Sequence, residues 1–278
     1  MASPSRTALH VALRRAAHQI YDHPLVFVDP LAVPILGAMY AEYLRRTPVR
    51  PDRPFSVALR AHLVARSRYA EDNLHRAVAA GIQQYVLLGA GLDTFAYRNP
   101  YSHLRVLEVD HPATQQWKRE LLSTAKISIP DSLTYVPVDF ESQSLPERLQ
   151  ASGFRMDEPA FFAWLGVVPY LTLAAFRATV AFVAARPAGS GLVFDYGQPR
   201  SVLPPLEQLA HDSLAARVAS AGEPFQLFFT PKQVAAELAD FYNFEDIGAD
   251  EINGRYFANR ADQLMTRGSG GRFVSAWL

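Results

Sequence analysis

Hydrophobic and polar positions follow two different periods along the chain, and the change falls in its first third. Before it, apolar residues recur at helical spacing over 8–20 and 55–80, with a shorter helix near 35–46 and a proline-containing loop over 47–54. No stretch of this part alternates as a strand does. Residues 1–80 are therefore predicted to form an N-terminal helical cap.

Short apolar runs separated by helical segments follow from Gly81 onward. The strands of a parallel sheet are buried on both faces, so they read as nearly continuous apolar runs, and helices connect them. We therefore predict an α/β fold, with helices on both faces of a mostly parallel sheet. The predicted strands are 84–90, 104–109, 132–138, 160–165 and 190–195, and the helices between them are 112–125, 146–152 and 172–186.

The alternation lapses after the fifth predicted strand. Proline-rich residues and a helix that the sheet does not need fill much of 197–231. A helix over 231–240 then leads to a strand-like run over 241–247, and a second strand-like run ends the chain at 272–278. We expect the two runs to form a hairpin beside the parallel strands, and residues 197–231 to form an inserted helical lid.

Composition and charge exclude several classes of function. The chain has 278 residues, 27 basic and 27 acidic side chains and no cysteine. A net charge of zero argues against a nucleic-acid partner, because phosphate binding needs a basic face. The lack of cysteine excludes disulfides, thiolate nucleophiles and zinc–thiolate sites. Since no signal peptide or membrane span is visible, we expect a cytoplasmic protein with no membrane partner.

A glycine pair follows the first predicted strand at once, in the sequence GAGLDT over 89–94. Ligands of open parallel sheets bind at the carboxyl ends of the strands, and glycine lets the backbone approach them closely. A dinucleotide fingerprint has a third glycine where this chain has Thr94, which weakens the case for NAD. The position after a buried strand favours a cofactor-binding turn over a purely structural one.

Acidic residues end the next two predicted strands. Asp110 lies about 20 residues beyond Gly89, where an acid can accept hydrogen bonds from ribose hydroxyls in NAD and S-adenosylmethionine sites. Asp110 is also a candidate helix cap, because His111 and a proline follow it, and both roles can hold at once. Asp139 and Phe140 end the third strand, where an acid and a ring can hold an adenine; the alternative is turn chemistry.

Two arginines lie on the long helix before the sheet. Arg66 and Arg68 point to different faces of that helix, so at most one of them reaches a common ligand. A cofactor with a free carboxylate would give one of them a partner, because a guanidinium binds a carboxylate through two hydrogen bonds. The alternative is an ordinary solvated helix face.

Five blocks carry a resemblance to a known family. ARSRYAEDNL, QYVLLGAGLDTFAYR, VLEVDHP, PVDFE and FFAWLGVVPYLT, in this order, resemble the leucine carboxyl methyltransferase family of class I S-adenosylmethionine-dependent methyltransferases, and most closely its bacterial small-molecule O-methyltransferase branch. The resemblance covers about residues 8–200. It implies a Rossmann-like seven-stranded sheet with an N-terminal helical cap, a core over 81–278 that binds S-adenosyl-L-methionine, and a lid after the fifth strand.

The resemblance also implies roles for single residues. Arg66 matches the arginine that binds the cofactor carboxylate, and Asp110 matches the acid on the ribose. The remaining matches are Gly89 and Gly91 beside the methionine part, and Asp139 with Phe140 at the adenine.

One block departs from the family. Eukaryotic members carry a glutamate after the fourth strand in a Glu-Gly-Leu block, where this chain has Leu165-Gly166-Val167. A cofactor contact assigned to that glutamate does not transfer to this chain, and its absence weakens the case for carboxyl-methylating specificity.

Methyl transfer from a sulfonium mainly requires that the nucleophile is held in line and that water is excluded. A carboxylate acceptor needs no base, whereas an alcohol or phenol would use one. His211, Tyr170 and Tyr196 are candidates by position, although packing or lining is the better interpretation of the tyrosines. We assign no catalytic residue, and no histidine spacing predicts a metal.

The expected lid is apolar, which suggests a hydrophobic small-molecule acid or alcohol as the methyl acceptor, as in secondary (polyketide-like) metabolism. The alternatives are a protein C-terminal carboxyl methyltransferase and a non-catalytic module that binds S-adenosylmethionine. A nicotinamide oxidoreductase has less support. The apolar residues concerned are Leu203, Leu206, Leu209, Leu214, Phe225, Leu227, Phe228 and Phe229.

Overall fold

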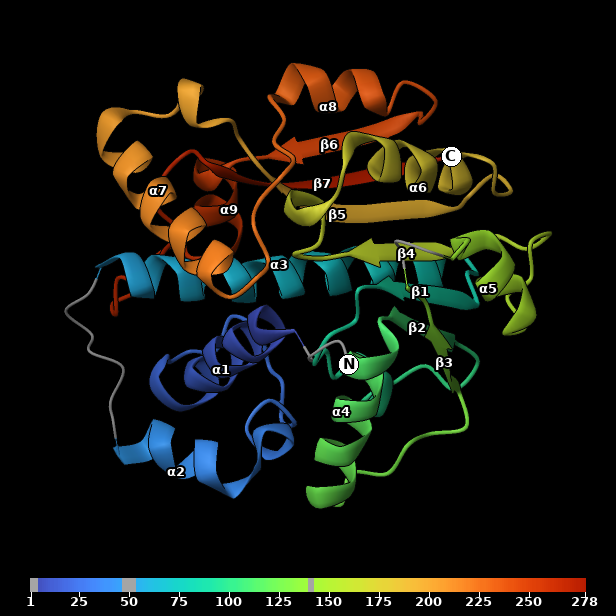
Figure 1. Cartoon of the computed structure of the whole chain (residues 1–278), viewed down its shortest axis with the longest axis horizontal. Helices are drawn as coiled ribbons and strands as arrows, with labels where there is room; N and C mark the ends of the chain where they lie inside the picture. The colour runs from blue at the N-terminus through green and yellow to red at the C-terminus, as the bar shows by residue number, and fades with distance from the viewer. Residues whose placement is uncertain (1–4, 47–53, 140–142) are drawn as a thin grey trace.

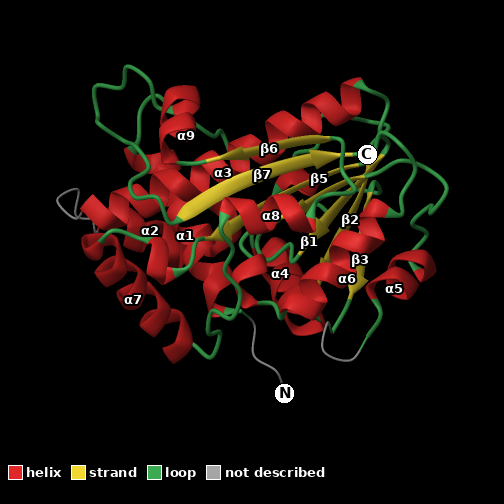
Figure 2. Cartoon of the chain, turned by 90° about the horizontal axis from the view of Figure 1, so that it is seen from above, coloured by secondary structure: helices red, strands yellow, loops and turns green. Residues whose placement is uncertain are grey.

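One twisted sheet of seven strands organises the chain (Figures 1 and 2). The computed structural model describes residues 5–46, 54–139 and 143–278. The strand order is β3-β2-β1-β4-β5-β7-β6, in which the first five strands are parallel and β7 runs antiparallel to both of its neighbours. The strands are β1 (Gln84–Leu88), β2 (Arg105–Asp110), β3 (Leu133–Pro137), β4 (Phe161–Trp164), β5 (Gly191–Gly197), β6 (Asn243–Ile247) and β7 (Gly271–Trp277).

The central strands are buried on both faces, and this explains their continuous apolar sequence. Every residue of β1 and β4 is buried, whereas β6 at the edge of the sheet exposes its first residues. The predicted parallel sheet with a late antiparallel hairpin is therefore confirmed.

Each face of the sheet packs against its own set of helices. On one face, apolar strand side chains form a core with α5, α6 and α8. On the other face, the alternate strand side chains form a second core with α3 and α9. A third apolar cluster packs α1, α2 and α4 together beside the glycine turn (Figure 1). The helices are α1 (Arg6–Tyr21), α2 (Gly37–Arg46), α3 (Pro54–Ala79), α4 (Pro112–Thr124), α5 (Leu145–Ala151), α6 (Leu173–Ala184), α7 (Pro205–Ser220), α8 (Pro231–Glu237) and α9 (Ala249–Tyr256).

Helix α3 connects the N-terminal helices to the sheet. It spans 26 residues and contacts α1 on one side and β4, β5 and β7 on the other. Helix α3 packs along one face of the sheet, and its residue Arg66 binds Asp195 near the carboxyl end of β5, at the edge where ligands of this architecture bind.

The segment after β5 differs from the prediction in part. Leu206 and Leu209 on α7 were expected to cover the sheet, but 79% and 66% of their surface is exposed, and α7 has no buried residue. Leu203, Leu227 and Phe229 are buried as expected. Leu206 and Leu209 lie on the outer side of α7, since the half-buried residues of this helix, including Gln208 and His211, form a different stripe.

The C-terminal part of the chain has one irregular segment and one helix that the sequence does not predict. Residues 225–230 are irregular, and α9 lies where the sequence predicts no helix. Within the described part of the chain, no helix is both long enough and apolar enough to span a membrane.

Candidate functional site

A cavity of about 400 Å³ lies at the carboxyl ends of β1 and β4. Its walls come from α1, α3, the glycine turn after β1, the loop after β4, and residues 222–226 beyond α7. Small-molecule sites in proteins commonly have volumes of roughly 300–1,000 Å³. Four of the predicted site residues line it: Arg66, Gly89, Gly91 and Asp110.

The glycine turn forms the floor of this cavity. The amides of Gly89 and Ala90 both donate to the carbonyl of Val109, at 2.8 and 3.1 Å. Gly89 has φ +68°, and a Cβ there would lie 2.4 Å from Cγ2 of Val167, so no larger residue fits. Thr94, at the position of a third glycine, is buried and donates to Oδ2 of Asp29 at 2.8 Å, so this position anchors the preceding loop.

The carboxylate of Asp110 binds two backbone amides at the glycine turn and at the start of α4. Oδ2 accepts from the amide of Gly91 at 2.5 Å, and Oδ1 accepts from the amide of His111 at 2.7 Å. Burial raises the pKa of Asp110, and the two amides oppose that rise. Each carboxylate oxygen keeps a further lone pair, with which Asp110 could accept hydroxyl groups from the cavity.

The alternative interpretation of Asp110 as a helix cap is wrong. The N-cap of α4 is His111, whose Nδ1 accepts from the amide of Ala113 at 3.1 Å. The carboxylate of Asp110 binds the glycine turn instead of the first turn of the helix.

Arg66 is held by an acid that the sequence analysis did not single out. Its Nη1 donates to Oδ2 of Asp195 at 2.9 Å, and Oδ1 of Asp195 accepts from the amide of Gly166 at 2.5 Å. Nε of Arg66 is buried and has no hydrogen-bond partner among the described residues. Arg68 is exposed and pairs with Asp72, which confirms that only one of the two arginines faces inward.

The two residues predicted to hold the adenine stay a prediction, and the structure describes only one of them. Asp139 does not line the cavity; the amide of Asp139 donates to Oε1 of Gln143 at 3.0 Å, and its carbonyl accepts from the amide of Gln143. Phe140 lies outside the described residues.

A buried ionic network behind the turn was also missed. Arg15 of α1 donates to the carbonyl of Leu92 at 2.8 Å and lies 3.3 Å from Asp29 and 3.6 Å from Asp93. Burial would raise the pKa of Asp93, but Arg15 and Arg98 lower it below its ordinary value. A sequence signal existed, because Arg15 occupies the buried face of an amphipathic helix.

The three candidate bases have different surroundings. Tyr170 lines the cavity, and burial raises its pKa to about 12, although a hydrogen bond with Thr7 opposes the rise. Tyr196 is buried in the core and donates to Oδ2 of Asp246 at 2.7 Å. The ring of His211 is tilted against that of Phe228, with 5.2 Å between ring centroids, and His211 does not line the cavity. The packing interpretation is therefore confirmed for Tyr196, and the lining interpretation for Tyr170.

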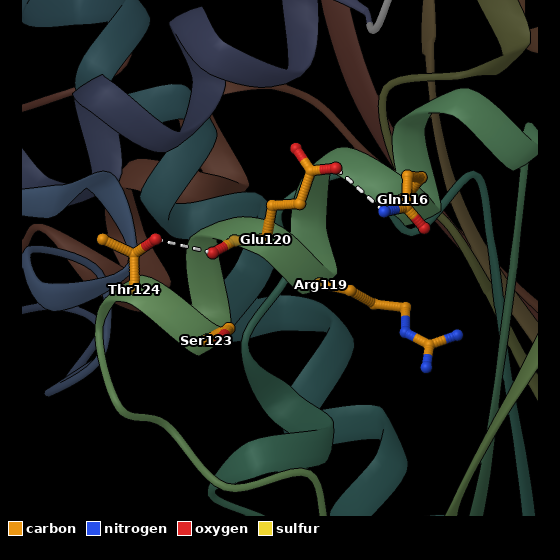
Figure 3. Close-up of a pocket in the computed structure, with 5 residues that line it drawn as sticks. All are labelled: Gln116, Arg119, Glu120, Ser123 and Thr124. Carbon is orange, nitrogen blue, oxygen red and sulfur yellow. Dashed lines mark hydrogen bonds between the residues drawn. The ribbon is translucent and has the colours of Figure 1, made fainter.

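A second hollow, of about 450 Å³, lies on the outer face of α4 (Figure 3). Its residues all belong to this one helix, where Glu120 accepts from Gln116 through its side chain and from Thr124 through its carbonyl. With no second element as a wall, this hollow does not enclose a ligand. Among the described residues, no group of three or more acids and histidines is arranged to hold a metal ion.

The strand order, with an antiparallel β7 between β5 and β6, and the cavity beside the glycine turn define a class I S-adenosylmethionine-dependent methyltransferase. The chain belongs to the leucine carboxyl methyltransferase family, whose model matches residues 8–184. It is 32% identical, over 94% of its length and 93% of the relative, to "Putative S-adenosyl-L-methionine-dependent methyltransferase YktD" of Bacillus subtilis.

Further relatives agree with this assignment. A protein of Mycobacterium ulcerans with the same general description is 34% identical over 67% of this chain and 63% of its own. A solved structure described as a putative methyltransferase from Thermobifida fusca has a TM-score of 0.58 at 18% identity, covering 99% of this chain and 95% of that one. A DUF574 family protein from Streptomyces avermitilis has a TM-score of 0.55 at 16% identity, with 96% of each chain covered. The two structures support the fold.

Proposed function

We propose that this protein is an O-methyltransferase that transfers the methyl group of S-adenosyl-L-methionine to a carboxylate or hydroxyl of a hydrophobic small molecule. In this proposal the cavity holds the cofactor. Two features of the cavity fit that molecule: Gly89 and Gly91 leave the backbone of the turn open to a ligand, and Nε of Arg66 is a buried donor with no partner among the described residues.

The residues that would hold the cofactor follow from the geometry. Arg66, positioned by Asp195, would bind the carboxylate, and Asp110 would accept the ribose hydroxyls. Gly89 and Gly91 would lie beside the methionine part. When bound, the cofactor supplies a methyl group on a sulfonium, a leaving group that is already activated.

Tyr170 carries the argument for an oxygen acceptor. It lines the cavity, and its raised pKa keeps the phenol protonated at neutral pH, so it donates a hydrogen bond and does not remove a proton. An acceptor oxygen that is already negative, as in a carboxylate or an acidic hydroxyl, needs no base and would accept that hydrogen bond.

Aromatic side chains continue from Tyr170 away from the cavity. Ring centroids lie 5.3 Å apart between Tyr170 and Phe225, 6.0 Å between Phe225 and Phe228, and 5.2 Å between Phe228 and His211. Such a series of rings suits a planar, apolar acceptor of the kind made in secondary metabolism. The remaining work of the protein is to align the acceptor and exclude water.

The test is a methyl-transfer assay read by mass spectrometry. The purified protein is incubated with S-adenosylmethionine and a panel of aromatic and aliphatic acids, phenols and alcohols, with peptides ending in a free carboxylate as a separate arm. We expect methyl esters or ethers of small molecules. Methylation of peptide C-termini alone would contradict the proposal, as would cofactor binding without transfer to any acceptor.

A further inference from the structure

Glu223 is an acid of the cavity wall that pairs with no cation. Of the other acids that line the cavity, Asp93 lies 3.6 Å from Arg15, and Asp110 accepts from two backbone amides. None of the ion pairs within the described part of the chain includes Glu223. Its carboxylate is therefore available to accept a hydrogen bond or a proton from a ligand.

The end of α7 places Glu223 on the cavity wall. Gly222 has φ +85°, and its amide donates to the carbonyl of Ala219 at 3.0 Å. The amide of Glu223 donates to the carbonyl of Val218, also at 3.0 Å. These two bonds form a Schellman motif, in which the residue after the glycine usually makes an apolar contact with the helix. Here that residue is a glutamate that lines the cavity, and such departures from local rules are expected at functional sites.

Glu223 and Tyr170 are held together by Gln226. The amide of Gln226 donates to the carbonyl of Pro169 at 2.7 Å, and its Nε2 donates to the carbonyl of Tyr170 at 3.0 Å. Burial raises the pKa of Tyr170 to about 12, and the charge of Glu223 adds to this rise. The carboxylate of Glu223 therefore lies near the phenol hydroxyl against which the proposed function sets the acceptor oxygen.

The charge of Glu223 discriminates between the two kinds of acceptor oxygen. An acceptor carboxylate beside Tyr170 would meet Glu223 as a second anion, and two anions at close range repel each other. A neutral hydroxyl at the same place would donate a hydrogen bond to Glu223 and accept one from Tyr170. The two wall residues are thus complementary to a protonated hydroxyl.

We propose that Glu223 is the general base of methyl transfer and that the acceptor is a phenol that binds in its protonated form. The inference rests on the proposed function and narrows its acceptor class to hydroxyl compounds. A lone pair of the phenol oxygen forms the bond to the methyl carbon while the carbon–sulfur bond breaks and leaves its electron pair on sulfur. The phenol proton passes to Glu223, so the products are a methyl ether, S-adenosylhomocysteine and a neutral carboxyl group that later releases its proton to water.

The first test measures binding without methyl transfer. Protein saturated with S-adenosylhomocysteine is titrated calorimetrically with 2-naphthol and, separately, with sodium 2-naphthoate, which has the same ring system and a negative charge. We expect 2-naphthol to bind at least about tenfold more tightly. E223Q should lose most of this preference because it binds 2-naphthoate more tightly. The control E147Q removes a charge from an exposed position of α5 and should behave as the wild type does.

The second test follows turnover with two phenols of different acidity. At neutral pH 2-naphthol is protonated, whereas 4-nitrophenol is substantially ionised, and its ionised form has no proton to lose. E223Q should lower kcat for 2-naphthol by about a hundredfold or more, with little change in KM. E223D should restore part of the loss, and kcat for 4-nitrophenol should not fall in E223Q.

Three results would overturn the proposal. The first is equal affinity of the wild type for 2-naphthol and 2-naphthoate, including no measurable binding of either. The second is an unchanged kcat for 2-naphthol in E223Q, and the third is an equal loss of kcat for both phenols, which would give Glu223 a structural role only. Methyl esters of acids without any ether product would refute this inference and leave the proposed function intact, whereas absence of transfer to every acceptor would refute the proposed function itself.

Discussion

The guanidinium of Arg66 and the carboxylate of Asp195 meet at 2.9 Å although 129 residues separate them in the chain. The pair joins α3 to the end of β5, and the amide of Gly166 binds the other carboxylate oxygen. Both side chains are nearly buried, at 8% and 10% exposure. Asp195 therefore fixes the orientation in which Arg66 faces the cavity.

Removing the charge of Asp195 should loosen Arg66. In D195N the side chain keeps its shape, but it loses a charge-assisted hydrogen bond that contributes about 1.5–3 kcal/mol. We expect the Kd of S-adenosylhomocysteine, measured by calorimetry, to rise about tenfold or more. R68Q alters the exposed arginine of the same helix and should bind normally. Equal affinity in D195N and wild type would show that Asp195 does not position Arg66.

A methyl group at Gly166 should disturb the same pair. Gly166 has φ +71°, and a Cβ there would lie 2.7 Å from Nη1 of Arg66. We expect G166A to lower the free energy of unfolding by about 1–2 kcal/mol, because the left-handed backbone disfavours alanine, and to weaken binding of S-adenosylhomocysteine.

The matched control is G254A in α9, where nothing lies within 4 Å and φ is not positive. Alanine should raise stability there by about 0.5–1 kcal/mol. Urea denaturation of both variants gives the comparison, and destabilisation of the same size in the two would contradict the steric argument.

Asp110 lines the cavity and binds the amide of Gly91. D110A should weaken binding of S-adenosylhomocysteine by about 1.5–3 kcal/mol if the carboxylate accepts the ribose hydroxyls. Circular dichroism and a thermal melt confirm that the variant is folded. Unchanged affinity in a folded variant would remove Asp110 from the site.

His62 should make stability depend on pH. Burial lowers its pKa from 6.5 to about 4, while Asp195 nearby opposes the shift. Between these values the unfolded chain binds a proton at His62 and the folded chain does not, so stability is complete above pH 6.5 and falls as the pH falls toward 4. At pH 4.5 the loss from this residue is about 2.5 kcal/mol.

Urea denaturation at pH 7.5 and 4.5 measures this loss. In H62Q the difference between the two pH values should shrink by that amount, whereas H103Q, at an exposed position, should leave it unchanged. An identical pH dependence in H62Q and wild type would show that His62 titrates normally in the folded protein.

The sequence predicts the sheet well because buried parallel strands have a distinctive apolar pattern. The pattern also places Asp110 at the end of a strand, whereas only the family resemblance selects Arg66 over Arg68; both Arg66 and Asp110 line the cavity. The partners of these residues are harder to predict. Asp195 and Arg15 reach the site through contacts distant in the chain, and no local period encodes such contacts.

The segment after β5 shows a second limit of sequence patterns. Helix α7 carries apolar residues on several sides, so its pattern does not reveal which side faces inward. Leu206 and Leu209 are exposed, and residues 222–226 supply the cavity wall that α7 was expected to supply.

A crystal structure of the protein with S-adenosylhomocysteine tests the central claim most directly. We expect the ligand in the cavity, with its carboxylate within hydrogen-bond distance of Arg66 and its ribose hydroxyls on the carboxylate of Asp110. The glycine turn at Gly89 and Gly91 should lie against the homocysteine part. A ligand bound elsewhere, or bound in the cavity with neither Arg66 nor Asp110 in contact, would contradict the account.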